Sequence, residues 1–118
     1  MVGRVAARIP EGAVTAMPPA EPLSPSEIED RLRSLPGWSV ADGRLTRTYR
    51  LSSHIAAAAM VVHIAGIQEQ LIHHSDLTLG YNTLVLAVAT HDAGGALTDL
   101  DFTLAERVEA IAPAHGAR

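Results

Sequence analysis

The chain has 118 residues, 47% of them hydrophobic and 3% aromatic, with no cysteine and a formal net charge of -4. This length predicts one domain, and the absence of cysteine excludes disulfides, thiolate metal ligands and a cysteine nucleophile. The acidic balance disfavours nucleic-acid binding, and no apolar run reaches the roughly 18 residues of a membrane-spanning helix or forms the core of a signal peptide. We therefore expect a soluble, cytoplasmic protein.

The N-terminal segment is rich in proline and has no hydrophobic period, which predicts a flexible extension. The expected boundaries are residues 1–22 for this extension, 23–113 for the domain and 114–118 for a short tail. The first helix should begin after Ser24, because Ser24, Pro25 and Glu27 form a capping box with proline at the first helical position. Apolar residues on one stripe continue this helix until Pro36-Gly37, which should end it.

Extended segments are expected on either side of a long helix. Residues 38–40 and 45–51 form the first two, and Asp42-Gly43 between them is typical of a tight hairpin turn. Residues 77–89 are also extended, and their last seven residues are apolar on both faces, as in an interior strand. A turn should follow at residues 91–95.

The long helix should run from Ser52 or Ser53 to about Ile72, because apolar residues recur every three or four positions. Its two apolar sets are Ile55, Ala59 and Val62, and Met60, Ile64, Ile67 and Leu71. This Ala-rich helix has more apolar positions than one sheet face can cover, which predicts self-association. A last helix should start at Thr98, with Asp101 completing a capping box, and end before Pro113. The order α-β-β-α-β-(β)-α predicts an α+β fold: a single antiparallel sheet of about four strands with helices on one face.

Six histidines are the candidates for chemistry. His54, His63 and His115 stand alone, and we expect no specific role for them. His73 and His74 end the long helix and His91 ends the apolar strand, so these three imidazoles converge if that strand lies beside the helix end. Imidazole, with a pKa of about 6.5, donates and accepts protons near neutrality.

Other interpretations of the three histidines remain open from spacing alone. A histidine at a helix C-terminus is stabilised by the helix dipole and the last carbonyl groups. Three histidines can also hold zinc. However, adjacent residues rarely point both rings at one ion, and the chain has no His-Glu-x-x-His pattern, so we expect no metal.

The histidines belong to a longer pattern that resembles the signature of the pterin-4a-carbinolamine dehydratases. The pattern is Glu69-x3-His73-His74-Ser75-x5-Tyr81-x9-His91-x9-Asp101, flanked by Leu23-Ser24-Pro25, Pro36-Gly37-Trp38 and Leu97-Thr98. The resemblance covers roughly residues 23 to 112. It implies dehydration of a 4a-hydroxytetrahydropterin, such as the tetrahydrobiopterin derivative, to the quinonoid dihydropterin. It also implies no metal or organic cofactor and a homodimer or homotetramer.

The resemblance also implies roles for single residues. His73 and His91 would be the acid and base, and His74 would bind and orient the pterin ring. Glu69 would polarise the His73 imidazole or bond a pterin nitrogen, although an exposed helix acid explains it equally well. Asp101 would contact substrate, but its place in a capping box with Thr98 is the favoured interpretation.

Several positions depart from the family pattern. Ile72 replaces the usual acid, Ser75 the usual proline, Leu77 an aromatic residue and Ala89 a small polar residue, and one extra residue precedes Asp101. These changes remove polar and aromatic contacts to a pterin and spare the histidines. The alternative is therefore a non-catalytic relative: a pterin dehydratase-like RuBisCO assembly factor of α-carboxysomes, with RuBisCO as its partner. A partner-binding module, like the family's dimerisation cofactors of transcription factors, is a third possibility.

Overall fold

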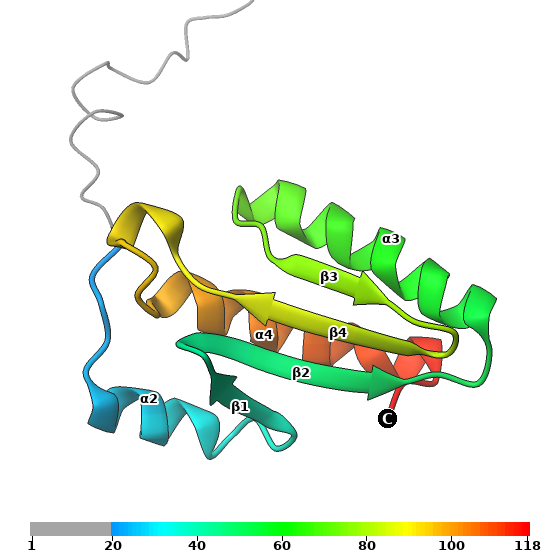
Figure 1. The fold of residues 1–118 in the computed structure, drawn as a ribbon, viewed down its shortest axis with the longest axis horizontal. Helices are drawn as coiled ribbons and strands as arrows, with labels where there is room; N and C mark the ends of the chain where they lie inside the picture. The colour runs from blue at the N-terminus through cyan, green and yellow to red at the C-terminus, as the bar shows by residue number, and fades with distance from the viewer. Residues whose placement is uncertain (1–19) are drawn as a thin grey trace, which may run out of the picture.

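The structure is a computed structural model that describes residues 20–118. Nearly all of the expected N-terminal extension, residues 1–19, lies outside the described residues (Figure 1). The helices are α2 (Pro25–Leu32), α3 (His54–Leu71) and α4 (Asp99–Ile111), and the strands are β1 (Trp38–Ala41), β2 (Arg44–Arg50), β3 (Asp76–Leu79) and β4 (Thr83–Val88). Two short 3-10 helices, η1 (His91–Ala93) and η2 (Ala112–His115), precede and follow α4. None of the helices within residues 20–118 is long and apolar enough to cross a bilayer.

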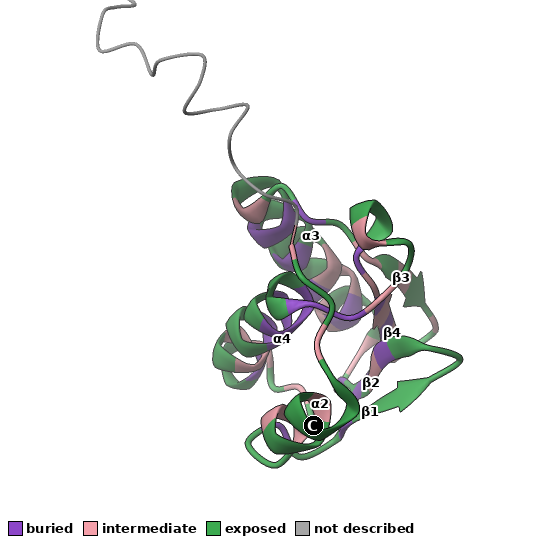
Figure 2. Ribbon diagram, turned by 90° about the vertical axis from the view of Figure 1, so that its left-hand side faces the viewer, coloured by how far each residue is buried: buried purple, intermediate pink, exposed green. Residues whose placement is uncertain are grey.

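The four strands form one antiparallel sheet in the order β1-β2-β4-β3. Figure 2 views this sheet from its end and shows α3 and α4 on one side of it, with the buried residues between the layers. The predicted α+β architecture is confirmed. The Asp42-Gly43 turn is also confirmed: both residues have positive φ, 53° and 76°, as a two-residue turn matching the twist of a hairpin requires.

The helix starts follow the caps predicted from the sequence. Ser24 with Glu27, and Thr98 with Asp101, form complete capping boxes, and the Ser53 side chain caps α3. The end of α2 differs from the expectation, because the helix stops at Leu32 instead of continuing to Pro36. Residues 33–35 make three successive i→i+3 backbone bonds that tighten the chain into a turn.

Buried and half-buried side chains alternate along β4, and the buried ones form part of the core. Leu84, Leu86 and Val88 are buried beneath the helices, whereas Thr83, Val85 and Ala87 point to the other face and are half-buried. β4 lies between β2 and β3, which confirms the predicted interior strand. From α3, the buried residues are Ala57, Met60, Ile64, Ile67 and Gln68.

The end of the chain is bonded to the sheet. Residues 114–118 were expected to be a tail beyond the domain. In the structure, Arg118 and Arg50 exchange two backbone hydrogen bonds of 2.9 and 2.8 Å, and η2 leads the chain to this position. The C-terminal residues therefore continue the packed fold beside the end of β2.

A polar cluster joins the hairpin to α4. The indole nitrogen of Trp38 and the hydroxyl of Tyr49 both donate to Glu109 Oε2, the first over 3.0 Å. The Arg47 guanidinium lies 4.1 Å from the Tyr49 ring centre, and its Nε is 3.5 Å from the same carboxylate oxygen. Burial raises the pKa of Tyr49 well above the usual range of a phenol, and the hydrogen bond to Glu109 raises it further. The Tyr49 hydroxyl therefore stays protonated and links β2 to α4 through its hydrogen bond to Glu109.

We expect the Tyr49 hydroxyl to ionise only when the chain unfolds. Since its pKa is higher in the folded than in the unfolded chain, this group leaves the free energy of unfolding unchanged below about pH 10 and lowers it as the pH rises further. In a Tyr81→Phe variant Tyr49 is the one remaining tyrosine, so the ultraviolet absorbance of tyrosinate reports on it alone. Tyrosinate absorbance should appear together with the loss of circular dichroism. Its appearance at about pH 10 in a chain that is still folded would contradict the expectation.

Candidate functional site

The end of α3 directs two consecutive histidines to opposite sides. Ile72 takes a left-handed conformation with φ of 51°, and its N–H bonds the Glu69 carbonyl. The N–H of His73 then bonds the Gln68 carbonyl over 3.0 Å, which completes a Schellman-type helix end. As a result His73 is buried and His74 is exposed.

His73 is held by a carboxylate that is completely buried. Its Nε2 lies 2.7 Å from Asp101 Oδ1, and the two side chains are 8% and 0% exposed. The other oxygen, Oδ2, accepts from the Thr98 backbone N–H over 2.9 Å and from the Thr90 hydroxyl over 2.8 Å. An ionised carboxylate only accepts hydrogen bonds, so His73 Nε2 carries the hydrogen and the tautomer of a neutral imidazole is fixed.

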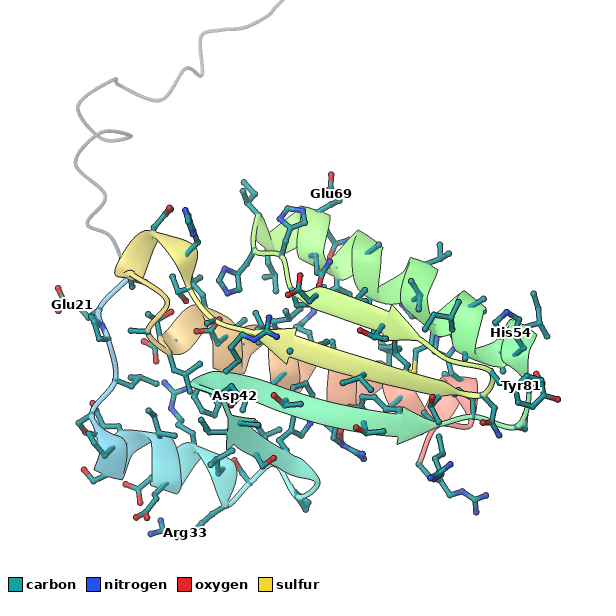
Figure 3. The ribbon with its side chains drawn as sticks, viewed as in Figure 1. Glu21, Arg33, Asp42, His54, Glu69 and Tyr81 are labelled. Carbon is teal, nitrogen blue, oxygen red and sulfur yellow. The ribbon has the colours of Figure 1, made fainter. Side chains whose placement is uncertain are left out.

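His74 pairs with a carboxylate on the surface. Its Nε2 lies 2.8 Å from Glu69 Oε2, and the side chains are 59% and 75% exposed. The family resemblance implies that Glu69 polarises His73 or bonds a pterin nitrogen, with an exposed helix acid as the equally good alternative. The structure exposes Glu69 and pairs it with His74. Figure 3 shows Glu69 pointing outward at the end of α3. The left-handed Ile72 is the reason, because it turns His73 inward and leaves His74 on the side of Glu69.

His91 begins η1 and is separated from the last residue of β4 by Ala89 and Thr90. Thr90 bonds Ala96 across this loop, and the N–H of Gly95 bonds the Thr90 carbonyl over 3.0 Å. Gly94 and Gly95 have φ of 72° and 86°, conformations that glycine adopts without strain. The predicted turn at residues 91–95 is thus present, and it holds an exposed imidazole at the end of the central strand.

A pocket of about 360 Å³ brings two of the three histidines together. It opens at the ends of β3 and β4, and its lining residues are Arg44, His74, Ser75, Asp76, Ala87, Val88, Ala89, His91 and Gly95. His74 and His91 contribute to its wall. His73, Glu69 and Asp101 are not among the lining residues, and Asp101 has no exposed surface.

The remaining histidines lie elsewhere. His54 Nδ1 is 2.7 Å from the Tyr81 carbonyl oxygen, and the two rings are stacked with an angle of 3° between their planes. Figure 3 places this pair at the opposite end of α3 from Glu69. Tyr81 belongs to the sequence signature but lies in this exposed turn. His63 Nδ1 and His115 Nε2 are 2.8 Å apart and join α3 to η2.

Two pocket residues escape the sequence analysis. Arg44 starts β2 and Asp76 starts β3, and their side chains form an ion pair of 2.6 Å. The signal available in the sequence is that Asp76 follows the histidine pair directly and that Arg44 follows the hairpin turn. Within residues 20–118, no cluster of three or more His, Asp or Glu side chains is arranged to hold a metal ion.

Comparison with known proteins gives consistent matches over the whole domain. A family model described as pterin 4 alpha carbinolamine dehydratase matches residues 21–111. A Streptomyces coelicolor protein, provisionally named a pterin-4-alpha-carbinolamine dehydratase, is 69% identical over 99 residues, which are 84% of this chain and 98% of that protein. A Chloroflexus aurantiacus protein with the same provisional name is 44% identical over 89 residues, 75% of this chain and 95% of that one. The crystal structure of a transcriptional coactivator/pterin dehydratase from Brucella melitensis matches with a TM-score of 0.72 at 32% identity, covering 77% of this chain and 98% of that chain.

The buried network around Asp101 should be important for stability. We expect Asp101→Asn to lower the free energy of unfolding by about 1–3 kcal/mol, because the amide offers one acceptor oxygen in place of two and brings a donor against other donors. Urea unfolding measures the change. Asp99→Asn is the matched control: this carboxylate is 71% exposed and pairs with Arg31 at the surface, so its loss should cost less than about 1 kcal/mol. Equal losses in the two variants would contradict a special role for Asp101.

Proposed function

Since the chain belongs to the pterin-4a-carbinolamine dehydratase family, we propose that it converts a 4a-hydroxytetrahydropterin to the quinonoid dihydropterin in the pocket beside His74 and His91. The observation that carries this proposal is the junction of three segment ends. There, the imidazoles of His74 and His91 line one pocket, and that of His73, the residue before His74, is fixed by a buried carboxylate. A small planar ligand in this pocket would lie against the imidazoles of His74 and His91.

The reaction is a loss of water: it needs two proton transfers, and no electrons pass to or from a cofactor. The bond from C4a to the hydroxyl oxygen breaks, and a proton delivered to that oxygen lets it leave as water. A second group takes the proton from ring nitrogen N5 as the new double bond forms. Imidazoles suit both steps, because their pKa allows the charged and the neutral form near pH 7.

We assign the two transfers to His91 and His73, and the orientation of the ring to His74. His91 supports this assignment by its position on the pocket wall. His73 supports it by its fixed orientation, because a carboxylate partner orients an imidazole and stabilises its charged form. His74 is held only by an exposed carboxylate, so it is better suited to binding than to a positioned proton transfer.

His73 would have to contact the substrate from outside the pocket wall. His73 does not line the pocket, so its imidazole contacts the substrate only if the bound ring extends past His74. Asp101 acts through His73 in this scheme, as a positioning residue. Its burial and its three hydrogen bonds favour that role over direct contact with substrate.

The rate test uses purified protein and a 4a-hydroxytetrahydropterin generated in the assay. His91→Ala and His73→Ala should each lower the rate by at least ~100-fold, the smaller effect expected for loss of a positioned acid or base. His63→Ala, on the exposed face of α3, should keep the wild-type rate and serves as the control.

Two outcomes would contradict the proposal. A wild-type rate equal to the spontaneous reaction would exclude the dehydratase and leave the RuBisCO assembly factor as the alternative to test. A wild-type rate that His73→Ala leaves unchanged would remove His73 from the proton transfers and leave His74 as the partner of His91.

We also propose that the chain self-associates through α3. Ile55 and Val62 are 75% and 72% exposed, although both are large apolar residues on a regular helix. Ala59 and Gly66 are exposed on the same stripe, so the backbone of a second helix could approach closely. This stripe is the first of the two apolar sets predicted from the sequence, whereas the second set packs on the sheet. Covering it would remove apolar surface from water.

Sedimentation at micromolar concentration tests the association. The wild-type chain should sediment as a dimer or tetramer of the 12.5 kDa protomer. Val62→Asp should shift it towards the monomer, because a carboxylate would be buried without a partner in the interface. Thr103→Asp, an exposed position on α4, is the control and should leave the mass unchanged. A wild-type monomer would overturn the proposal.

A further inference from the structure

We propose that Asp76, held in place by Arg44, determines the specificity of the pocket by binding an amino-pyrimidinone edge of the ligand. This inference rests on the proposed pterin substrate and adds the residue that would distinguish a pterin from other bicyclic rings. Among the described residues, Arg44 and Asp76 form the one ion pair of which both members line the pocket.

The sheet register places the pair across the central strand. β4 lies between β2 and β3 (Figure 1), and Asp76 is directly opposite Ala87 on β4. Arg44 and Asp76 belong to the helix-free face, because Leu45 and Leu86 beside this row point into the core. The Arg44 side chain therefore crosses β4 on that face to donate from Nη1 to Asp76 Oδ2 over 2.6 Å.

Small residues on β4 leave room beneath this bridge. Ala87, on the helix-free face of β4, lines the pocket together with the next two residues, Val88 and Ala89, and the Val88 side chain is buried in the core. Larger side chains there would fill the space between Asp76 and His91. The pocket thus has an alanine floor, a carboxylate held by a guanidinium on one side and an imidazole on the other.

The chemistry of a carboxylate defines the ligand edge that fits. Arg44 bonds only Oδ2, and no other described side chain bonds the Asp76 carboxylate, which is 76% exposed. A carboxylate accepts two parallel N–H groups, as it does from an arginine fork. The pyrimidine ring of a pterin carries this arrangement as a ring N–H beside an exocyclic amino group. Arg44 keeps the acceptor oriented and balances its charge.

This edge would also set the orientation of the ring. With the amino-pyrimidinone held at Asp76, the second ring, which carries N5 and adjoins C4a, is directed away from the ion pair and towards the histidines. Asp76 would therefore act as a binding residue, with the proton transfers left to the imidazoles. A ring with a carbonyl in place of the amino group would set its oxygen against the carboxylate, and such a mismatch lowers affinity strongly.

If Arg44 and Asp76 only stabilised the fold, substituting them would change the free energy of unfolding and leave the ligand preference as it is. Arg44 and Asp76 are 44% and 76% exposed, and ion pairs of this kind contribute little to stability. Asp76→Asn should therefore fold like the wild type, with the same urea midpoint. Any change in ligand preference is then a property of the pocket.

Calorimetric titration with pterin and with lumazine, which has a 2-carbonyl in place of the 2-amino group, is the decisive experiment. The wild type should bind pterin at least ~10-fold more tightly than lumazine, and Asp76→Asn should bring the two affinities within a few-fold of each other. Arg44→Gln should lower the preference partly. Asp92→Asn, an exposed carboxylate in η1 that does not line the pocket, is the matched control and should keep the wild-type preference.

The experiment distinguishes failure of the role proposed for Asp76 from failure of the proposed dehydratase function. A wild type that dehydrates the pterin substrate while Asp76→Asn keeps the full preference for pterin over lumazine would overturn this inference and leave the proposed function intact. A wild type that neither binds pterin nor accelerates dehydration would overturn both.

Discussion

The carboxylate of Asp101 is the constraint on which the site depends. It has no exposure to water, and a buried charge is costly unless it is fully hydrogen-bonded. Three donors satisfy it, and they come from three places in the fold: His73 after the end of α3, Thr90 just beyond the end of β4, and Thr98 at the start of α4, the helix to which Asp101 belongs. Loss of any one of these segments from the junction would remove one of the three hydrogen bonds that stabilise the buried carboxylate. The ends of the elements are thereby fixed relative to one another.

This junction creates two environments a single residue apart. His73 is buried, and its tautomer is fixed by a carboxylate that has three hydrogen bonds and no exposed surface. His74 is exposed to solvent, and its partner Glu69 is also exposed and therefore holds it only weakly. The pocket beside His74 is completed by His91 from η1 and by the ion pair of Arg44 and Asp76. A general acid or base benefits from the first kind of environment, and reversible binding of a ring from the second.

Much of this arrangement could be predicted from local sequence, because local signals determine it. Ser24, Ser53 and Thr98 cap the helices through their own side chains, and Asp42-Gly43 adopts the backbone that a tight hairpin needs. The period of the apolar residues predicted α3 and separated its two apolar sets, of which the structure buries the second against the core. The sequence also places Asp101 in the first turn of α4, where the capping box predicts the hydrogen bond from the Thr98 N–H to one of its two oxygens.

The parts that escaped prediction depend on contacts between distant segments. The bond between Asp101 and His73 spans 28 positions, and that between Arg44 and Asp76 spans 32. Neither follows from a helix or strand pattern, because strand order and register must first be known. The pairing of Glu69 with His74 depends on one backbone conformation, the left-handed Ile72. Nothing in the residue type signals it, since a β-branched residue rarely takes that conformation.

Ile72 also has a consequence for engineering. A left-handed conformation costs a residue with a Cβ atom roughly 1–2 kcal/mol, and with its side chain 85% exposed, Ile72 regains little of this through packing. Glycine or asparagine takes the same backbone at lower cost and would remove an apolar side chain from the surface. The side chain lines no part of the pocket. This helix end is therefore a position where heat tolerance and solubility could be improved together, leaving every side chain that lines the pocket in place.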